Sequence, residues 1–236
     1  MEVSRRIILG VGAVAVVGGG AGALMMRSTA QTSAQTTAQA TSPATTVPPA
    51  TPVAGDPRLA ERSIGRADAK VTVHEFYSMT CSHCATFHKE SMPQIHKELI
   101  DTGRIRMVFH DFPLDKLALT ASVIARYLPA ERYEPFVAAL LASQERWIYA
   151  KAPNTPTDEI WKFAALAGLS RANFDAALAD QATSNALLSA QDRDGKSYQI
   201  DSTPSFVFQG PKVASRRESG GRSFLDFAKL VVEAGG

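Results

Sequence analysis

The chain has 236 residues, a formal net charge of +2 at neutral pH, 45% hydrophobic residues and 20% charged residues. This balance is ordinary for a globular protein, and it excludes a wholly disordered chain, a collagen-like fibre and a polytopic membrane protein. No long run of Lys or Arg occurs, so nothing indicates a nucleic-acid partner. The two cysteines are too few for a multi-disulfide scaffold or a four-thiolate zinc site.

Residues 1–26 have the pattern of a bacterial export signal. Arg5 and Arg6 precede residues 7–26, which carry no charge and as a helix would span about 30 Å, the thickness of a hydrocarbon core. A positive start before an apolar run is typical of a signal sequence, and the paired arginines resemble those of twin-arginine signals. Small residues near the end of the run offer cleavage sites, but an uncleaved membrane anchor fits equally well. Cleavage and the export route therefore stay open.

Residues 27–57 predict a disordered linker. They are mostly Thr, Ala, Pro, Ser and Gln, and they contain no aromatic residue. Such a segment cannot bury enough apolar surface to offset the conformational entropy that ordering costs. We therefore expect a spacer that joins the export segment to one folded domain, residues 58–236.

The folded domain begins with a predicted strand, helix and strand. Residues 71–77 are β-branched and aromatic, with apolar side chains on both faces, which is typical of a central strand. We expect a helix over about residues 81–101, capped by Ser78 or Thr80. A second strand is predicted over residues 105–110, and the crossover between parallel strands should be right-handed.

The second half of the domain returns to strands after a helical block. Apolar residues recur at helical spacing over about residues 114–198, and Pro and Gly divide this block into several helices. Strand character returns over residues 205–209, and residues 212–214 could pair back as a hairpin. Ser223 is expected to cap a last helix. The order βαβ, helical insertion, ββα predicts the α/β class.

Cys81-Ser82-His83-Cys84 directly follows the first strand and opens the first helix. That context makes a Cys-x-x-Cys sequence a redox hypothesis. Amides at a helix N-terminus carry partial positive charge, so they would stabilise a Cys81 thiolate and lower its pKa. Cys84, one turn deeper, would be the less exposed, resolving thiol. His83 can donate a hydrogen bond or charge to the thiolate, which favours the reduced form and makes the disulfide an oxidant.

Two other interpretations of the cysteines stay open. A structural disulfide is disfavoured because so short a loop removes little entropy from the unfolded chain. A zinc site could combine Cys81 and Cys84 with His88 and His74, but a second regularly spaced ligand pair is missing. We expect no metal, and no cofactor besides the redox-active Cys81–Cys84 pair. The other histidines are interpreted as structural residues without evident partners, namely His74, His96 and His110, with His88 as a polar position on the first helix.

Two segments resemble one protein family. Glu75-Phe-Tyr-Ser-Met-Thr-Cys-Ser-His-Cys84 resembles the active-site segment of bacterial DsbA-like proteins. Ser202-Thr-Pro-Ser-Phe-Val-Phe208 resembles the cis-proline loop and the following strand of the same family. The motifs occur in the family's order, with a helical block between them, so the resemblance covers roughly residues 60–235. It implies a thioredoxin fold with a helical insertion between its two halves, and thiol:disulfide oxidoreductase activity.

The resemblance also implies a role for each matching residue. Cys81 would be the nucleophile, Cys84 the resolving cysteine and His83 the residue that tunes the thiolate. Pro204 would follow a cis peptide bond, and the backbone of Thr203 would pair with an extended substrate peptide. A cis proline has a physical use there, because it turns the chain sharply and frees backbone groups beside the sulfurs.

Glu75 lies inside an apolar strand, where burying a carboxylate is costly and raises its pKa. DsbA-like proteins have an acidic residue at this position, which implies a proton relay for Cys84. The alternative is an ordinary strand residue that faces solvent or pairs with a lysine. Ser82 stands where the best-known members of the family have proline, so the strength of the pair as an oxidant stays open.

The expected function is an exported thiol:disulfide oxidoreductase that introduces disulfides into periplasmic proteins. We expect a monomer, either soluble or tethered to the inner membrane by residues 7–26. Its partners would be exported proteins with free thiols, unfolded or still folding, and a membrane protein that re-oxidises it. The alternatives are a disulfide reductase or isomerase of the same compartment or, in a different class, a chaperone-like or metal-binding thiol module.

Overall fold

The computed structural model describes residues 55–236. The predicted export segment and the predicted linker as far as residue 54 lie outside this range. Among the helices of residues 55–236, none is both long and apolar enough to cross a membrane.

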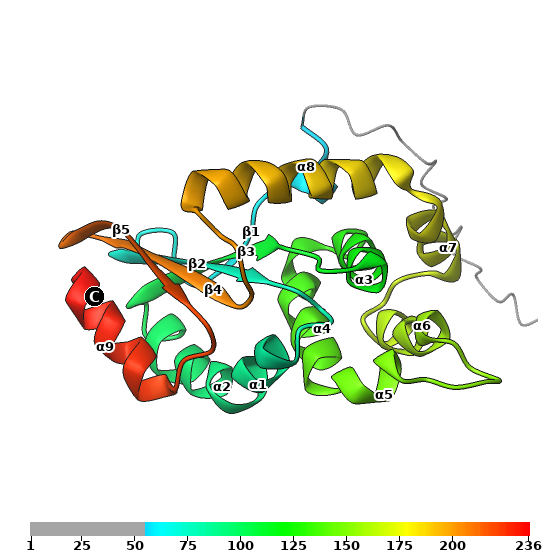
Figure 1. The fold of residues 1–236 in the computed structure, drawn as a ribbon, viewed down its shortest axis with the longest axis horizontal. Helices are drawn as coiled ribbons and strands as arrows, with labels where there is room; N and C mark the ends of the chain where they lie inside the picture. Colours follow the sequence, from blue (N-terminus) through cyan, green and yellow to red (C-terminus); the bar gives the residue numbers. More distant parts are fainter. Residues whose placement is uncertain (1–54) are drawn as a thin grey trace, which may run out of the picture. The chain divides into compact units, whose positions relative to one another are not determined.

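A five-stranded sheet lies at the centre of the described chain (Figure 1). The strand order is β1-β3-β2-β4-β5, with β2 and β3 parallel and the other neighbours antiparallel. The short edge strand β1 was not predicted, because its three residues show no alternating pattern. The bounds of the strands are β1 (Arg62–Ile64), β2 (Val71–Tyr77), β3 (Ile105–Asp111), β4 (Ser205–Gly210) and β5 (Val213–Ser219).

Strand β2 lies at the middle of the sheet, and apolar clusters cover both of its faces. Val71 and Val73 belong to the main core, and Phe76 belongs to a separate small cluster on the opposite face. Side chains alternate along a strand, so Glu75 faces the main core and His74 faces the small cluster. These two adjacent polar residues therefore enter different environments.

Helices cover both faces of the sheet (Figure 1). Helix α8 lies on one side, and the group of α1, α2 and α9 lies on the other. A π-helical turn over His96–Ile100 and a 3₁₀ turn over Pro57–Leu59 complete these layers. The bounds of the sheet-covering helices are α1 (Ser82–Glu90), α2 (Met92–Ile95), α8 (Gln181–Tyr198) and α9 (Phe224–Ala234).

The remaining helices form an insertion between β3 and β4, and the predicted α/β thioredoxin fold with a helical insertion is confirmed. The insertion begins with α3 and ends with α8, which returns the chain to the sheet. Ser170 and Ser223 cap α7 and α9 through their hydroxyls. The other helices of the insertion are α3 (Lys116–Arg126), α4 (Ala130–Ala142), α5 (Gln144–Ile148), α6 (Pro156–Leu166) and α7 (Arg171–Ala179).

The start of α1 differs from the prediction that Ser78 or Thr80 caps it. Cys81 is the N-cap, and its sulfur accepts a hydrogen bond from the amide of Cys84. A thiol is a weaker acceptor than a hydroxyl, which is why the hydroxyl residues were the expected caps. As a thiolate, however, the Cys81 sulfur is a charged acceptor at a helix N-terminus, where negative charge is stabilised.

Candidate active site

The two cysteines lie where β2 passes into α1, and both are free thiols. The Cys81 Sγ accepts a hydrogen bond from the Cys84 amide at 3.4 Å and donates one to the Thr203 carbonyl oxygen at 3.3 Å. Cys81 is 7% exposed and Cys84 is 0% exposed. The expected order is thus observed, with one sulfur at the edge of the protein and one behind it.

The surroundings shift the pKa values of the two thiols in opposite directions. The hydrogen bond with Cys84 is the main cause that lowers the pKa of Cys81 to about 5, with help from Thr203 and from the amides of Cys84 and His83. Burial raises the pKa of Cys84 far above its usual range, and the neighbouring Cys81 sulfur and Glu75 carboxylate add to this rise. At neutral pH Cys81 is therefore mainly a thiolate and Cys84 a neutral thiol; the bond that Cys81 donates to Thr203 belongs to its thiol form.

His83 contributes to the site through its backbone. Its amide is among the groups that lower the pKa of Cys81, whereas its side chain is exposed. Across residues 55–236, no hydrogen bond joins the His83 imidazole to the Cys81 sulfur. A tuning role for the imidazole thus stays a prediction.

The loop before β4 completes the site from the opposite side. The Thr203–Pro204 peptide bond is cis, as predicted. The Thr203 carbonyl oxygen accepts a hydrogen bond from the Cys81 thiol. The Pro204 carbonyl oxygen accepts a hydrogen bond from the Gly220 amide at 2.8 Å. A second cis bond, Ala152–Pro153 in the insertion, was not predicted, because nothing in the local sequence distinguishes it from a trans bond.

Glu75 lies behind the cysteines and is fully buried, at 0% exposed. Its Oε1 accepts a hydrogen bond from the Nε2 of His88 at 2.8 Å. The alternative in which Glu75 faces solvent or a lysine is wrong. The interpretation of His88 as an ordinary polar position on α1 is also wrong, because its side chain is 1% exposed. The spacing of four residues from Cys84 to His88 was the signal available, since it puts both side chains on one face of a helix.

The other face of the sheet holds a different histidine cluster. His74 Nδ1 lies 2.9 Å from His110 Nε2, and the outer nitrogens of the two rings bond to Gln209 Oε1 at 3.1 Å and Asp194 Oδ2 at 3.0 Å. The interpretation of these histidines as residues without partners is therefore wrong. His96 also has a partner, since its Nδ1 lies 3.2 Å from Asp101 Oδ1.

The zinc interpretation is not supported by the positions of its ligands. His88 is bonded to Glu75, and His74 lies on the opposite face of the sheet with His110. Among residues 55–236, no group of three or more His, Cys, Asp or Glu side chains is arranged to hold a metal ion.

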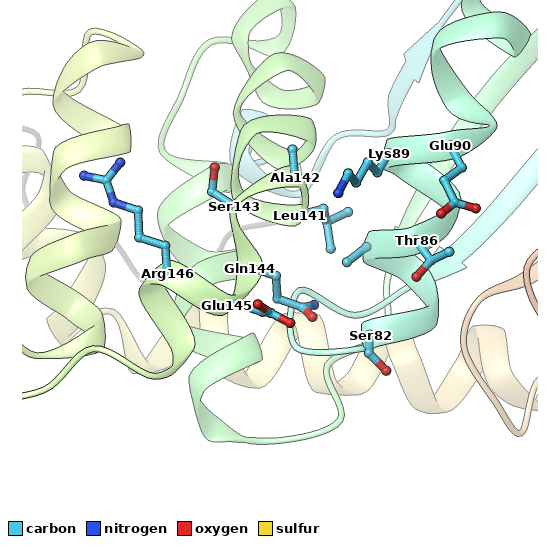
Figure 2. A pocket seen from close by; sticks show the side chains of 11 residues that line it. Ser82, Thr86, Lys89, Glu90, Leu141, Ala142, Ser143, Gln144, Glu145 and Arg146 are labelled. Carbon is cyan, nitrogen blue, oxygen red and sulfur yellow. The ribbon is translucent and has the colours of Figure 1, made fainter.

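A polar groove lies on the side of α1 that faces the insertion (Figure 2). Its volume is about 530 Å³, and Ser82, which follows Cys81 in the sequence, lies at one end. The buried Gln144 amide donates to the carbonyl oxygens of Met79 and Cys81 at 2.9 and 3.0 Å. Gln144 thereby fixes the loop that carries Cys81 to the start of α5. The sequence offered no signal for this contact, because it joins residues more than 60 positions apart.

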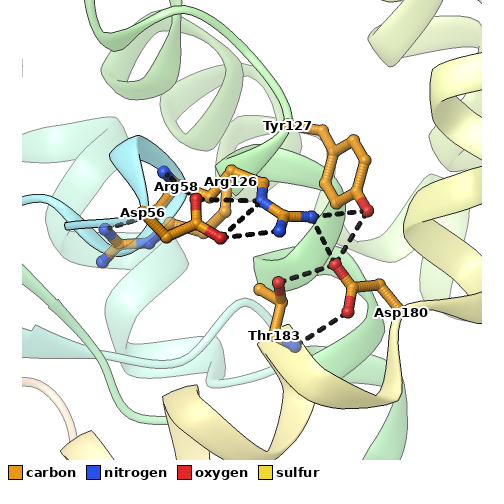
Figure 3. A network of polar contacts seen from close by, with 6 residues as sticks. All are labelled: Asp56, Arg58, Arg126, Tyr127, Asp180 and Thr183. Atoms are coloured by element: carbon orange, nitrogen blue, oxygen red, sulfur yellow. Dashed lines mark hydrogen bonds and ion pairs between the residues drawn. The ribbon is translucent and has the colours of Figure 1, made fainter. Parts of the chain in front are cut away.

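A separate polar network fixes the start of the described chain (Figure 3). Arg58 pairs with Asp56 and with Asp180, both at 2.6 Å, and its Nη1 donates to the Tyr127 hydroxyl at 2.8 Å. The Thr183 hydroxyl donates to Asp180 at 2.7 Å. These contacts tie the chain at Asp56 to α3 and α8. The boundary between the predicted linker and the domain stays a prediction.

Comparison with known proteins gives one family and several relatives. The family model described as thioredoxin matches residues 58–226. A Rickettsia bellii protein, provisionally named a protein-disulfide oxidoreductase, is 28% identical over 148 residues, covering 62% of this chain and 56% of the relative. Disulfide bond formation protein D of Bacillus subtilis is 36% identical over 58 residues, covering 24% of this chain and 26% of the relative. The chain thus spans about half the length, or less, of these curated relatives.

A solved structure shows the same fold. The crystal structure of Wolbachia pipientis alpha-DsbA1 matches with a TM-score of 0.67 and 24% sequence identity, covering 75% of this chain and 91% of that chain. At this identity the likeness concerns the arrangement of the backbone.

Proposed function

The chain belongs to the thioredoxin family, and from that premise we propose that it is an exported thiol:disulfide oxidoreductase that oxidises the thiols of other proteins. The observation that carries the proposal is the opposite shift of the two thiol pKa values. A stabilised Cys81 thiolate favours the reduced enzyme, so the disulfide form is driven to accept electrons.

The reaction proceeds by two thiol–disulfide exchanges. A substrate thiolate attacks the Cys81 sulfur of the disulfide, and the electron pair of the broken bond goes to Cys84. Cys84 takes up a proton because its raised pKa makes its thiolate unfavourable at neutral pH. A second substrate thiolate then attacks the substrate sulfur and releases Cys81 as a thiolate. The substrate loses two electrons and gains a disulfide, and the enzyme becomes a dithiol.

The other residues bind the substrate or manage the proton. The backbone beside the cis Pro204 forms hydrogen bonds with an extended substrate segment. The Thr203 carbonyl oxygen supports this, since it already accepts a hydrogen bond from the Cys81 thiol. Glu75 relays the proton to Cys84, which its burial and its effect on the pKa of Cys84 support. His83 stabilises the Cys81 thiolate through its amide.

The proposal places this reaction in the periplasm of a bacterium. The export pattern of residues 1–26 supports it, and residues 7–26 would either be removed or tether the domain to the inner membrane. The substrates are exported proteins with free thiols. Each turnover leaves the enzyme reduced, so a membrane protein that accepts two electrons must re-oxidise it. The enzyme acts as a monomer.

The test compares two variants, each of which keeps one of the cysteines. Cys81→Ser should lose all catalysed oxidation of a reduced, unfolded protein and should form no mixed disulfide, because the attacked sulfur is gone. Cys84→Ser should also lose turnover. When it is mixed with a protein that carries a disulfide, however, its Cys81 thiolate should attack that disulfide, release one substrate thiol and accumulate mixed disulfides that are visible on non-reducing gels. Oxidation at the wild-type rate by Cys81→Ser would overturn the assignment.

A further inference from the structure

The buried Glu75–His88 pair has unused hydrogen-bonding capacity. The side chains are 0% and 1% exposed. Within residues 55–236, one oxygen of Glu75, Oε2, and one nitrogen of His88, Nδ1, have no hydrogen-bond partner. Buried polar atoms without partners are uncommon, and each such atom costs roughly 1–3 kcal/mol. The pair therefore keeps one free acceptor oxygen and one free ring nitrogen in the protein interior.

Helix geometry places the pair next to Cys84. Cys84 and His88 are four residues apart on α1, so their side chains lie on the same face of the helix. Both are buried, and Glu75 on β2 bonds to His88 and acts electrostatically on Cys84. The thiol, the carboxylate and the imidazole are thus all buried on the side of β2 that α1 covers.

The charges around His88 favour the protonated form of its imidazole. Burial alone would lower the pKa of His88, but the Glu75 carboxylate more than offsets this, and Glu134 of α4 acts in the same direction, so the pKa is raised. The Tyr77 ring lies 6.1 Å from the imidazole. Tyr77 remains a neutral phenol, because burial and Asp111 raise its pKa well above the usual value.

We propose that His88 is the proton reservoir for Cys84, acting through the carboxylate of Glu75. This proposal rests on the proposed function, because it supplies the proton that Cys84 takes up when the disulfide opens. His88 is a positioning and proton-holding residue rather than a group that touches the substrate.

The proton transfer balances without any further reactant. When a thiolate opens the disulfide, Cys84 leaves with the electron pair as a thiolate. The proton on His88 Nε2 passes to Glu75 Oε1, and the carboxyl group gives a proton to Cys84. His88 ends neutral, Glu75 ends as a carboxylate, and Cys84 ends as a thiol. Solvent protonates His88 again before the next turnover.

A reservoir of this kind gives the reaction a specific pH dependence. The proton is available only below the pKa of His88, which the Glu75 carboxylate raises above the ordinary value of 6.5 for histidine. Opening of the disulfide should therefore slow as pH rises through that pKa, once the rate is divided by the concentration of attacking thiolate. Cys81 does not produce this signature, because in the oxidised protein it carries no titrating thiol.

The experiment measures the opening of the oxidised protein by reduced glutathione from pH 5 to pH 9. The variant is His88→Gln, whose amide can still donate to Glu75 but cannot carry the proton. The thiolate-normalised rate of the wild type should fall through one ionisation as pH rises. His88→Gln should be about 100-fold slower at pH 6, the low end of what a positioned general acid contributes, and flat with pH.

The control is His96→Gln, the same substitution at a partly exposed histidine paired with Asp101. It should keep the wild-type ionisation. If His88→Gln keeps the wild-type pH profile, the proposal is overturned, even if all its rates are uniformly lower. Glutathione opens the disulfide whether or not the protein is an oxidant in the cell. Failure of this proposal is thus distinguishable from failure of the proposed function.

A second measurement needs no variant and covers the case in which His88→Gln does not fold. Nitrogen chemical shifts of labelled histidine report whether both ring nitrogens carry a proton. In the oxidised wild-type protein the His88 imidazole should be doubly protonated at pH 6.5 and should titrate above that pH. A neutral His88 imidazole at pH 6.5 would contradict the proposal.

Discussion

Two histidine clusters lie on opposite faces of the same strand, and they are built differently. Glu75 of β2 faces α1 and bonds to His88, and each partner keeps one buried atom that is unpaired within the described part of the chain. His74, the preceding residue, faces α8 and bonds to His110 and Gln209, and both of its ring nitrogens are used. The complete network holds structure together, whereas the incomplete pair lies beside the reacting sulfurs.

Electrostatics separates the clusters in the same way. Burial lowers the pKa of His74, and it also lowers that of His110 despite the hydrogen bond to Asp194. His88 is the opposite case, because its pKa is raised by a carboxylate that is itself fully buried. Asp194 keeps 18% of its side chain exposed, and water weakens its attraction for a proton on His110. A buried carboxylate therefore favours the protonated form of His88, whereas burial without an equally buried carboxylate favours the neutral forms of His74 and His110.

The largest expected difference between the clusters is in stability. His88→Ala leaves the buried Glu75 carboxylate without its partner, and breaking a buried pair in this way costs about 3–5 kcal/mol of unfolding free energy. His74→Ala removes hydrogen bonds between uncharged partners, and we expect a smaller loss of about 1–3 kcal/mol. Denaturant titration of both variants in the oxidised form measures the two losses.

The pH dependence of disulfide opening should also distinguish the two histidine clusters. His74→Ala should retain the wild-type pH profile for the opening of the disulfide, because His74 lies on the face away from Cys84. Equal stability losses, or a pH profile altered by His74→Ala, would show that the two faces of β2 do not differ in the way their hydrogen bonds indicate.

A smaller effect is expected in the pH dependence of the reduced protein. The pKa of Cys81 is about 5 in the folded protein, against an ordinary value of 9.0. A lowered pKa contributes stability that is complete above the unfolded value and is lost as pH falls through the folded value. The unfolding free energy of the reduced protein should thus rise by about 3 kcal/mol between pH 5 and pH 9, after allowance for partial solvent access.

The oxidised protein is the control for this effect, because its two sulfurs do not titrate. The unfolding free energy of the reduced form minus that of the oxidised form should increase as pH rises from 5 to 9. Cys84 does not cancel the trend below pH 9, since its thiol is protonated in both the folded and the unfolded chain there. A difference that stays constant over this range would be inconsistent with a lowered pKa at Cys81.

The sequence predicted those parts of the site that are local or belong to a recognisable motif. Cys81 and Cys84 share one segment with the strand before them, and Pro204 lies in a short loop that resembles a known one. The strand–helix–strand order followed from hydrophobic periodicity. These features depend on neighbours within a few residues, so a linear pattern contains them.

Features that depend on register and long-range packing could not be predicted in the same way. His74 and His110 meet because β2 and β3 pair in parallel with Phe76 opposite His110, and nothing in either strand specifies that register by itself. Gln144 reaches Cys81 only through the packing of the insertion. His88 was accessible in principle through its spacing from Cys84, but its partner, Glu75, is defined only once α1 packs on β2.

The claim that the Cys81–Cys84 disulfide is an oxidant is tested most directly by its reduction potential. The wild-type protein is equilibrated at pH 7 with glutathione buffers of known ratio, and the fraction of reduced protein is measured by alkylation. Because the Cys81 thiolate is stabilised, we predict a potential well above the value of about −270 mV for thioredoxin and toward the value of about −120 mV for DsbA. A potential at or below about −270 mV would contradict the claim and would favour a reductase.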